Sequence, residues 1–280
     1  MLSKLFKGSL LSAGLAGAMC VTAPKAVAEE PAINNGAIAF SFSADVTTNY
    51  FFRGFELEDS GLIFQPSFGA STDIAEGISV YVGTWQSIHS EQTGEEGNGP
   101  GAWYESDFYV GVVFAVLEGL EIDISYVGYY YPNGNFDEIH ELDIAAGYDA
   151  SSILEGLGFG VLIAIELENE NGDDLTYGEL SASWGTDIVE GGDYPISLAL
   201  DIILGLSLDD YYTDDGDNEF FGYLQFNVGA STPLTFIPDE YGSWSGGVTV
   251  SFIILNDDAL TDDSGEDFRV FLTVGVAADY

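Results

Sequence analysis

Carboxylates dominate the side chains that could do chemistry in this sequence, and few cations oppose them. The chain of 280 residues has 47 Asp and Glu against five Lys and Arg. Three of the five cationic residues lie before residue 29, where the sequence has no acidic residue. From residue 29 onward the only Lys or Arg residues are Arg53 and Arg269. Such a set can attract, repel or hold ions. Nucleic acid is excluded as a partner, because no basic surface exists to displace counterions from phosphates.

The carboxylates of interest recur at alternate positions within apolar segments, which places them on one face of a strand. Arg53 and Arg269 fall on inward faces at the loop-side ends of the first and last segments. These segments become neighbours when a barrel closes, so we expect the two arginines to lie close together, each held by carboxylates. The two arginines either form a constriction that selects ions or neutralise the interior and fasten the closing seam of a barrel. The acidic set either favours cations in a pore or is solvated surface without selectivity. It comprises Asp45, Asp107, Glu121, Asp123, Glu141, Asp143, Glu166, Glu168, Glu179 and Asp201.

The spacing of the histidine, serine and acidic residues supports neither a catalytic site nor a metal site. Ser87 near His89, and His140 beside Glu138 and Glu141, are partial constellations without the arrangement of a nucleophile and its base. The acidic loops do not fit EF-hand spacing, and no His or Cys cluster offers a transition-metal site. We therefore expect no catalytic residue, no metal and no cofactor.

The first 28 residues have the pattern of an export signal. Lys4 and Lys7 precede a mostly apolar run over 10–21, and the small residues of 26–28 form a cleavage site before Glu29. The only cysteine, Cys20, lies inside this segment. The mature chain, 29–280, is therefore predicted to be one domain without disulfides. Its large negative charge would also suit a surface exposed to saline water.

After residue 28 the apolar residues recur with a period of two, and no run reaches the roughly 18 residues of a membrane-spanning helix. Hydrophobic residues make up 46% of the chain, which is too apolar for an acidic disordered protein. Twelve segments are each long enough to cross a bilayer as a tilted strand of about ten residues. They lie approximately at 37–55, 61–72, 78–90, 102–116, 119–131, 138–149, 157–168, 175–186, 194–209, 219–231, 243–255 and 267–280.

The connections between these segments alternate in kind. Mostly compact turns follow the even-numbered segments, with 232–242 as the longer exception, and acidic loops follow the odd-numbered ones. An even number of strands with two such rims is typical of the outer-membrane barrels of a Gram-negative-type envelope. A soluble lipocalin-like barrel is the alternative, although about eight strands suffice for it.

One face of most segments is apolar and the other is small or polar. A soluble barrel would fill its interior with large apolar groups, so we expect the apolar faces to point outward, toward lipid. Aromatic clusters at segment ends, such as 129–131 and 211–212, fit an interfacial girdle or ordinary cross-strand pairs. Inward Phe51, Tyr109, Tyr129 and Tyr223 are candidates to narrow or plug the lumen, because about eight strands are filled by side chains and about sixteen enclose a channel.

The last thirteen residues alternate apolar residues up to a terminal aromatic. The apolar positions are Leu272, Val274, Val276, Ala278 and Tyr280. This pattern resembles the C-terminal signal strand of bacterial outer-membrane barrels, and the resemblance implies the barrel-assembly machinery as a partner. A buried edge strand of some other β protein is the alternative.

The first three segments carry a more specific resemblance. Residues 49–55 read Asn-Tyr-Phe-Phe-Arg-Gly-Phe, residues 65–68 read Gln-Pro-Ser-Phe, and residues 81–87 read Tyr-Val-Gly-Thr-Trp-Gln-Ser. This resembles the TorF-type porins, whose N-terminal hairpins carry a Tyr-x-x-Arg-Gly element, a downstream Gln and a strand ending near Gly, Trp and Ser. The match covers less than the first quarter of the mature chain. It implies an outer-membrane location and a channel role, with no substrate and no catalytic residues.

The sequence therefore predicts an all-β protein, a single antiparallel up-and-down transmembrane β-barrel of about 12 strands. The expected function is a porin in which small solutes or cations diffuse passively through an acidic lumen. The alternative is a closed structural or surface barrel whose acidic loops bind partners or divalent cations. Outer-membrane lipid and small solutes or cations are the expected partners.

Overall fold

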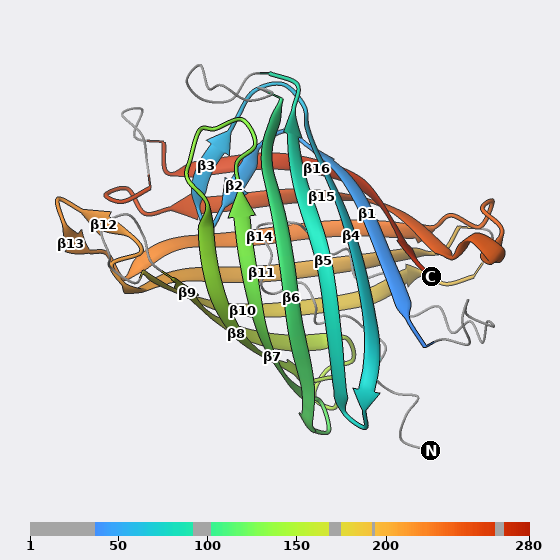
Figure 1. Cartoon of the computed structure of the whole chain (residues 1–280). Coiled ribbons are helices and arrows are strands. Elements are labelled where there is room, and N and C mark those ends of the chain that lie inside the picture. Colours follow the sequence, from blue (N-terminus) through green and yellow to red (C-terminus); the bar gives the residue numbers. More distant parts are fainter. Residues whose placement is uncertain (1–36, 92–101, 168–174, 192–193, 261–265) are drawn as a thin grey trace.

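The computed structural model describes residues 37–91, 102–167, 175–191, 194–260 and 266–280, and its principal feature is a closed β-barrel (Figure 1). Around the wall the strands follow the order β1, β16, β15, β14, β11, β10, β9, β8, β7, β6, β5, β4. No helix within these described ranges is long and apolar enough to cross a membrane. The wall strands are β1 (Ala39–Thr47), β4 (Ile63–Ala75), β5 (Ile78–His89), β6 (Trp103–Leu117), β7 (Leu120–Tyr130), β8 (Ile139–Asp149), β9 (Leu157–Glu166), β10 (Thr176–Val189), β11 (Ile196–Asp209), β14 (Phe221–Pro233), β15 (Ser243–Leu255) and β16 (Phe268–Asp279).

The predicted fold class is confirmed, with one wall strand for each of the twelve predicted segments. The first boundary is wrong: the segment predicted over 37–55 leaves the wall at Thr47, and its remainder forms a separate two-stranded sheet. The predicted export signal, 1–28, lies outside the described residues.

The last strand closes the barrel by pairing with the first. β1 and β16 run antiparallel from Ser41 opposite Asp279 to Thr47 opposite Thr273. Beyond that ladder, Phe40 and Tyr280 exchange two backbone hydrogen bonds of 2.9 Å, which extend the seam to the last residue. A closed ring leaves no wall strand with an unpaired edge, as lipid requires of any spanning sheet.

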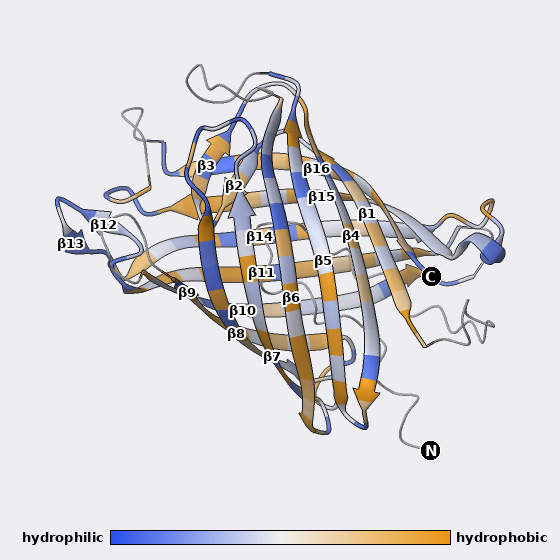
Figure 2. Cartoon of the chain, in the orientation of Figure 1, coloured by the Kyte–Doolittle hydropathy of each residue, from blue (hydrophilic) through white to orange (hydrophobic). Residues whose placement is uncertain are grey.

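The two faces of the wall differ as the sequence predicts. On β6, Phe108 and Val110 are 56% and 52% exposed on the outside, whereas the inward Asp107, which precedes Phe108, is fully buried. Figure 2 shows apolar residues recurring between more polar ones along the wall strands. On β16, Leu272, Val274, Val276 and Tyr280 are exposed on the outside. Ala278 is buried because the rings of Phe42 and Trp244, its two cross-strand neighbours, lie 6.0 Å apart on either side of it.

The two rims of the barrel carry different connections. Short turns join β4 to β5 and β6 to β7, and Gly77 and Gly119 supply the positive φ that these turns need. The β14–β15 connection contains a short 3-10 helix, η2 (Asp239–Tyr241). At the opposite rim, the longer β11–β14 connection forms a small sheet of β12 (Thr213–Asp214) and β13 (Asp217–Asn218). Strands β1 and β16 begin and end at the rim with the short turns (Figure 1).

The β1–β4 connection folds into the barrel as a hairpin of β2 (Tyr50–Phe52) and β3 (Phe55–Glu58). Its side chains contribute to two clusters of buried apolar residues inside the wall. Phe51 stacks on Phe271 of β16 at 5.2 Å, while Tyr50 packs on Trp85 of β5 at 5.5 Å. Consecutive aromatic residues point in opposite directions from a strand, so both faces of the hairpin are buried against the protein. The hairpin therefore fills the lumen near the rim that carries the longer loops.

Replacing Val274 by Arg should destabilise the barrel strongly, because Val274 lies in the middle of β16 on its exposed outer face. A cationic side chain on the lipid face at mid-membrane costs about 2–4 kcal/mol. The free energy of unfolding from lipid vesicles, measured in a denaturant titration, should fall by that amount.

The matched control is Thr273→Arg, which puts the same side chain on the lumen face of the same strand. Thr273 pairs with Thr47, two residues from the inward Asp45 of β1, so the new cation gains a nearby carboxylate. An equal loss of stability in the two variants would mean that the apolar face does not contact lipid.

Candidate functional site

The tip of the inward hairpin is a two-residue turn formed by Arg53 and Gly54. Their φ angles are 48° and 87°, and the flanking Phe52 and Phe55 are paired across the hairpin. Positive φ at both central residues is the geometry of a type I′ turn, which matches the twist of the two strands. Gly adopts it freely, whereas Arg at such an angle carries strain that surrounding contacts must offset. The turn directs the Arg53 side chain away from the hairpin and across the lumen.

Arg53 forms a buried, bidentate ion pair with Glu141 of β8. Its Nη1 and Nη2 donate to Glu141 Oε1 and Oε2 at 2.6 and 2.9 Å, and the two side chains are 5% and 2% exposed. Tyr129 of β7 donates its hydroxyl to Glu141 Oε2 at 2.8 Å and fixes the carboxylate. In the ring of strands β8 lies almost opposite β1 and β4, which carry the hairpin. The ion pair therefore joins the hairpin to the far wall of the barrel.

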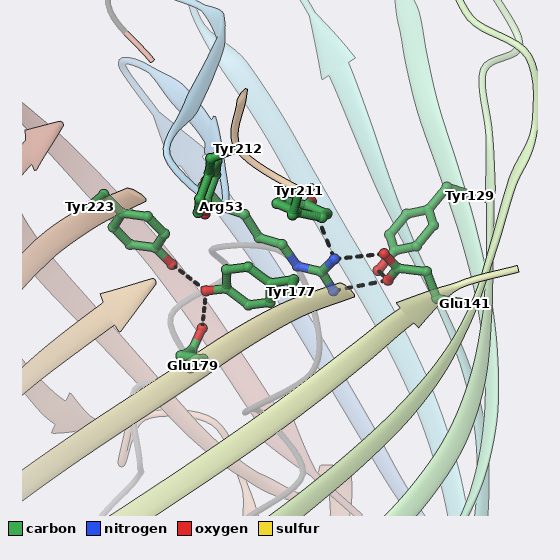
Figure 3. A network of polar contacts seen from close by, with 8 residues as sticks. All are labelled: Arg53, Tyr129, Glu141, Tyr177, Glu179, Tyr211, Tyr212 and Tyr223. Atoms are coloured by element: carbon green, nitrogen blue, oxygen red, sulfur yellow. Dashed lines mark hydrogen bonds and ion pairs between the residues drawn. The ribbon is translucent and has the colours of Figure 1, made fainter. Parts of the chain in front are cut away.

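Aromatic rings enclose the guanidinium beside its carboxylate (Figure 3). The Arg53 Cζ atom lies 4.8 Å from the ring centroid of Phe52, 4.5 Å from that of Tyr177 and 5.5 Å from that of Tyr211. Such contacts are strongest where water is excluded. Burial acts to lower the pKa of Arg53, but the attraction and hydrogen bonds of Glu141, together with the attraction of Tyr211 and Tyr129, outweigh it and raise the pKa well above its ordinary value. The guanidinium therefore stays charged inside its aromatic cage.

Hydrogen bonds extend this network to the neighbouring strands. Tyr212, in the β11–β14 loop, donates to the Arg53 carbonyl at 2.7 Å and so holds the backbone of the turn. Tyr177 of β10 donates to Glu179 at 2.8 Å, and its hydroxyl also lies 2.9 Å from that of Tyr223 on β14 (Figure 3). Side chains from β7, β8, β10 and β14 thus meet around one arginine.

A second group of contacts anchors the base of the hairpin to β5 and β6. Tyr50 donates to Glu105 at 2.8 Å. Glu58 of β3 lies 3.6 Å from His89 Nδ1, and His89 Nε2 is 2.8 Å from the Ser87 hydroxyl. This chain has the order of a hydrolase triad, but Ser87 is completely buried beneath the hairpin, so a substrate carbonyl has no access to it. In this structure the three side chains connect the hairpin to the wall.

Arg269 contacts different carboxylates from Arg53. It lies on β16, where Nε is 3.2 Å from Glu56 of the hairpin and Nη1 is 3.2 Å from Glu266. The expectation that both arginines lie on adjoining wall strands is wrong, because Arg53 sits at the hairpin tip and reaches β8. Carboxylates hold each arginine, as the sequence predicts.

The remaining predicted acidic residues belong to the lumen-facing set of the wall. Asp45 is buried on β1, close to Gly275 of β16, and Asp107 and Asp143 are buried on β6 and β8. The half-buried members are Glu121, Asp123, Glu166, Glu179 and Asp201, while Glu168 lies outside the described residues. Asp123 accepts the Tyr81 hydroxyl at 2.8 Å. Whether these carboxylates line a path for ions stays a prediction.

The aromatic residues near the segment ends divide between the two faces. Tyr130 and Phe220 are exposed, as an interfacial girdle requires. Tyr129 and Tyr212 are instead almost completely buried inside the barrel, where they hold Glu141 and Arg53. Sequence reasoning did place four aromatic residues inside as plugging residues. The structure confirms the burial of Phe51, Tyr129 and Tyr223, whereas Tyr109 is half-buried. Sequence reasoning did not predict the role of Glu58, because the predicted first strand ended before that residue.

Replacing Gly54 by Ala should loosen the hairpin. A Cβ at this position would lie 2.7 Å from Leu260 Cδ1 and 2.9 Å from Tyr223 Cδ1, in addition to the strain of the positive φ. The left-handed conformation alone costs about 1–2 kcal/mol, which corresponds to a roughly 5- to 30-fold shift in a local opening equilibrium. Amide hydrogen exchange over residues 50–58 should accelerate by at least that factor.

The control for this variant is Gly216→Ala in the exposed β12–β13 turn. Gly216 has a similar φ of 89°, and a Cβ there would meet no atom within 4 Å. Exchange over residues 50–58 should keep its wild-type rate in that variant. Wild-type exchange in Gly54→Ala would contradict the tight packing of the hairpin tip.

The sequence matches the model of a known protein family. The family model described as "Bacterial protein of unknown function (Gcw_chp)" matches residues 32–249. The TorF-type resemblance, which rests on residues 49–87, stays a prediction. No match was found among curated proteins.

Several solved structures are similar in fold, at very low sequence identity. The NanC porin is 8% identical with a TM-score of 0.47, over 85% of this chain and 98% of that chain. An outer membrane channel from Pseudomonas putida F1 is 8% identical with a TM-score of 0.47, over 87% of this chain and 94% of that chain. LpxR from Salmonella typhimurium is 8% identical with a TM-score of 0.42, over 85% of this chain and 99% of that chain. At these scores, any functional argument must rest on this chain's own geometry.

Proposed function

The chain belongs to the Gcw_chp family of bacterial proteins of unknown function. We propose that it is an outer-membrane channel for small cationic solutes. The observation that carries the proposal is the division of the closed wall into an exposed apolar outer face and a lumen face rich in carboxylates. In this proposal the lumen conducts when the β2–β3 hairpin is displaced. It involves no catalytic residue, metal or cofactor.

The outer face supports the membrane location. Large apolar side chains such as Phe68, Val82 and Val274 are about half exposed around the barrel. A soluble protein rarely exposes apolar surface on this scale, whereas lipid contact makes it favourable. The alternating C-terminal residues, Leu272 to Tyr280, would be the element that the barrel-assembly machinery recognises. In this proposal, the outer apolar face contacts the lipid of the outer membrane.

The lumen supports the preference for cations. Inward carboxylates on β1, β6, β7, β8, β9, β10 and β11 face only two arginines, and both arginines already have carboxylate partners. Rings of carboxylates favour cations over anions in a pore. Inward glycines such as Gly83, Gly111 and Gly160 have no side chain to occupy the lumen. The ring of Tyr109 lies against Gly83, and that of Tyr81 lies against Gly111.

A barrel whose hairpin never leaves the lumen is the second candidate. The two aromatic clusters and the buried Arg53–Glu141 pair favour it, because they fill the cross-section near one rim. Such a protein would be structural, and its acidic loops would bind partners or divalent cations. Among the described residues, no group of three or more Asp, Glu, His or Cys side chains is placed to hold a metal ion.

Planar-bilayer recording of the refolded mature protein separates these two candidates. A folded barrel is first identified by its heat-modifiable migration on a gel, and current is then recorded with a salt gradient across the bilayer. Discrete steps with a reversal potential that favours cations support the channel. A folded barrel that conducts neither at rest nor after displacement of the hairpin leaves the structural candidate.

A further inference from the structure

The part of the lumen around Arg53 holds more carboxyl groups than one arginine can pair with. Glu105 and Asp107 on β6, and Glu141 and Asp143 on β8, are each no more than 2% exposed. Strand β7 lies between these two pairs, and its inward Tyr129 donates to Glu141. Arg53 is the cation that contacts this group. Buried ionised carboxylates need a partner, so the group favours an additional cation or protons.

Two of the four carboxylates lack any hydrogen-bond donor among the described residues. Both oxygens of Asp107 and both oxygens of Asp143 are buried without a donor. Asp107 lies beside the carboxyl group of Glu105, with which it can form a hydrogen bond only when one of the two is protonated, and Asp143 lies within electrostatic range of Glu141 and Arg53. Asp107 lies opposite Tyr129 of β7, and Asp143 lies opposite Ser125, two lumen-facing positions further along that strand. They are places where donors from a ligand would be stabilised.

The surroundings of Arg53 define the chemistry of that ligand. A carboxylate that accepts two parallel hydrogen bonds, beside the rings of Tyr177 and Tyr211, matches a planar guanidinium and not a compact ammonium. We propose that this cage is a binding site for organic cations that carry a guanidinium and a second positive charge. Arg53 occupies the site as an internal ligand until a solute displaces it, which would free the hairpin. The proposal rests on the proposed channel function for the route of the solute, whereas binding itself can be measured without transport.

The positions of the carboxylates argue against a bare metal ion and for an extended ligand. No three acidic or histidine side chains of the described residues converge on a metal position. Asp143 lies two residues from Glu141 on β8, a separation of roughly 7 Å along the strand. An alkyl chain a few carbons long spans that distance between a guanidinium on Glu141 and an ammonium near Asp143. A ligand carboxylate would be repelled by the same group, so decarboxylated cations fit best.

Isothermal titration of the detergent-solubilised, folded protein with agmatine tests this proposal. Agmatine joins a guanidinium to a primary ammonium, and cadaverine is the matched dication without the guanidinium. The Arg53→Ala variant removes the internal competitor, so we expect it to bind agmatine at least about tenfold more tightly than the wild type does. It should also prefer agmatine to cadaverine by about tenfold or more. Arg269→Ala, which leaves the cage occupied, should bind agmatine as the wild type does.

The carboxylate is tested by adding Glu141→Gln to the Arg53→Ala variant, which should abolish the preference for agmatine. Arg53→Lys serves as a second variant should Arg53→Ala fail to fold, because lysine keeps the charge without the planar fork. Equal affinity for the two dications in the folded Arg53 variant, or no binding of either, would overturn the proposal. Agmatine binding by a barrel that never conducts would contradict the proposed channel function and would still support the binding site.

Discussion

Glu141→Gln is expected to convert a barrel that is mostly closed into one that conducts for much of the time. Glu141 holds Arg53 through two hydrogen bonds, and both side chains are buried. Removing one partner of a buried ion pair costs about 3–5 kcal/mol, because the other charge is left unpaired. In this protein the hairpin can avoid that cost by leaving the lumen and hydrating Arg53. The ratio of displaced to docked hairpin should then rise by roughly two to four orders of magnitude.

The matched control for this prediction is Glu166→Gln on β9. Glu166 lies directly opposite Glu141 in the β8–β9 ladder and is half-buried, and Arg53 donates to Glu141 instead. Its neutralisation should change the open fraction little. The open fraction of single channels in a planar bilayer is the quantity to compare among the wild type and the two variants. A similar open fraction in all three would mean that the ion pair does not hold the hairpin in place.

A double-mutant cycle with Arg53→Ala separates the ion pair from the other contacts of the hairpin. If the ion pair contributes most of the docking free energy of the hairpin, the two single variants and the double variant should have similar open fractions, because each removes the same interaction. Additive effects would instead assign much of the docking energy to the aromatic cage, which Arg53→Ala also disrupts through Phe52, Tyr177 and Tyr211.

The wall of the barrel was predictable because each of its strands has an apolar outer face and a more polar lumen face. That separation imposes a strict period of two, and turn residues such as Gly77 and Gly119 interrupt it where the chain reverses. Strand number, inward faces and the alternation of the rims all follow from this local pattern. The alternation on β16, with Leu272, Val274 and Val276 exposed and Phe271 buried, illustrates how directly the pattern reports the face.

The hairpin could not be separated from the first wall strand by periodicity, because β2 and β3 are strands as well. A signal was present in the three consecutive aromatic residues, Tyr50 to Phe52, which leave no polar face for a lumen. The Arg53-Gly54 pair that follows marks the turn. The partner of Arg53 was beyond sequence reasoning, since Glu141 lies 88 residues away and the contact depends on how far the hairpin reaches across the barrel. Local patterns define faces, whereas closure of the ring defines which residues meet across the lumen.

Deleting the hairpin is expected to produce a folded barrel with a permanently conducting lumen. The wall ladders involve none of the residues 49–60, because β2 and β3 pair only with each other in the described sheets. Thr47 of β1 is already paired with Ile63 of β4, so a four-residue Gly-Ser linker can join these strands. The deletion also removes Arg53 and the contacts of Phe51 and Tyr50 with the wall. Heat-modifiable migration should therefore persist while the obstruction is lost.

The size of the effect follows from how firmly the hairpin is docked. A hairpin held by a few kcal/mol is displaced for about 0.1–10% of the time. Its deletion should therefore raise the mean current through a membrane with equal numbers of barrels by roughly one to three orders of magnitude. The lumen loses one of its two arginines and keeps the carboxylates of the wall, so the reversal potential should shift further toward that of the cation.

Deletion of residues 213–218 is the matched control, because β12 and β13 form an exposed hairpin at the same rim without entering the wall ladders. It should leave the mean current at the wild-type level. Tyr211 and Tyr212 stay in place in that variant, so the cage around Arg53 is preserved. A hairpin-deleted barrel that folds and still carries no current would mean that inward side chains of the wall, such as Tyr177 and Tyr223, close the lumen by themselves. Twelve strands lie between the roughly eight that side chains fill and the roughly sixteen that enclose water, and this pair of deletions decides on which side of that boundary the barrel lies.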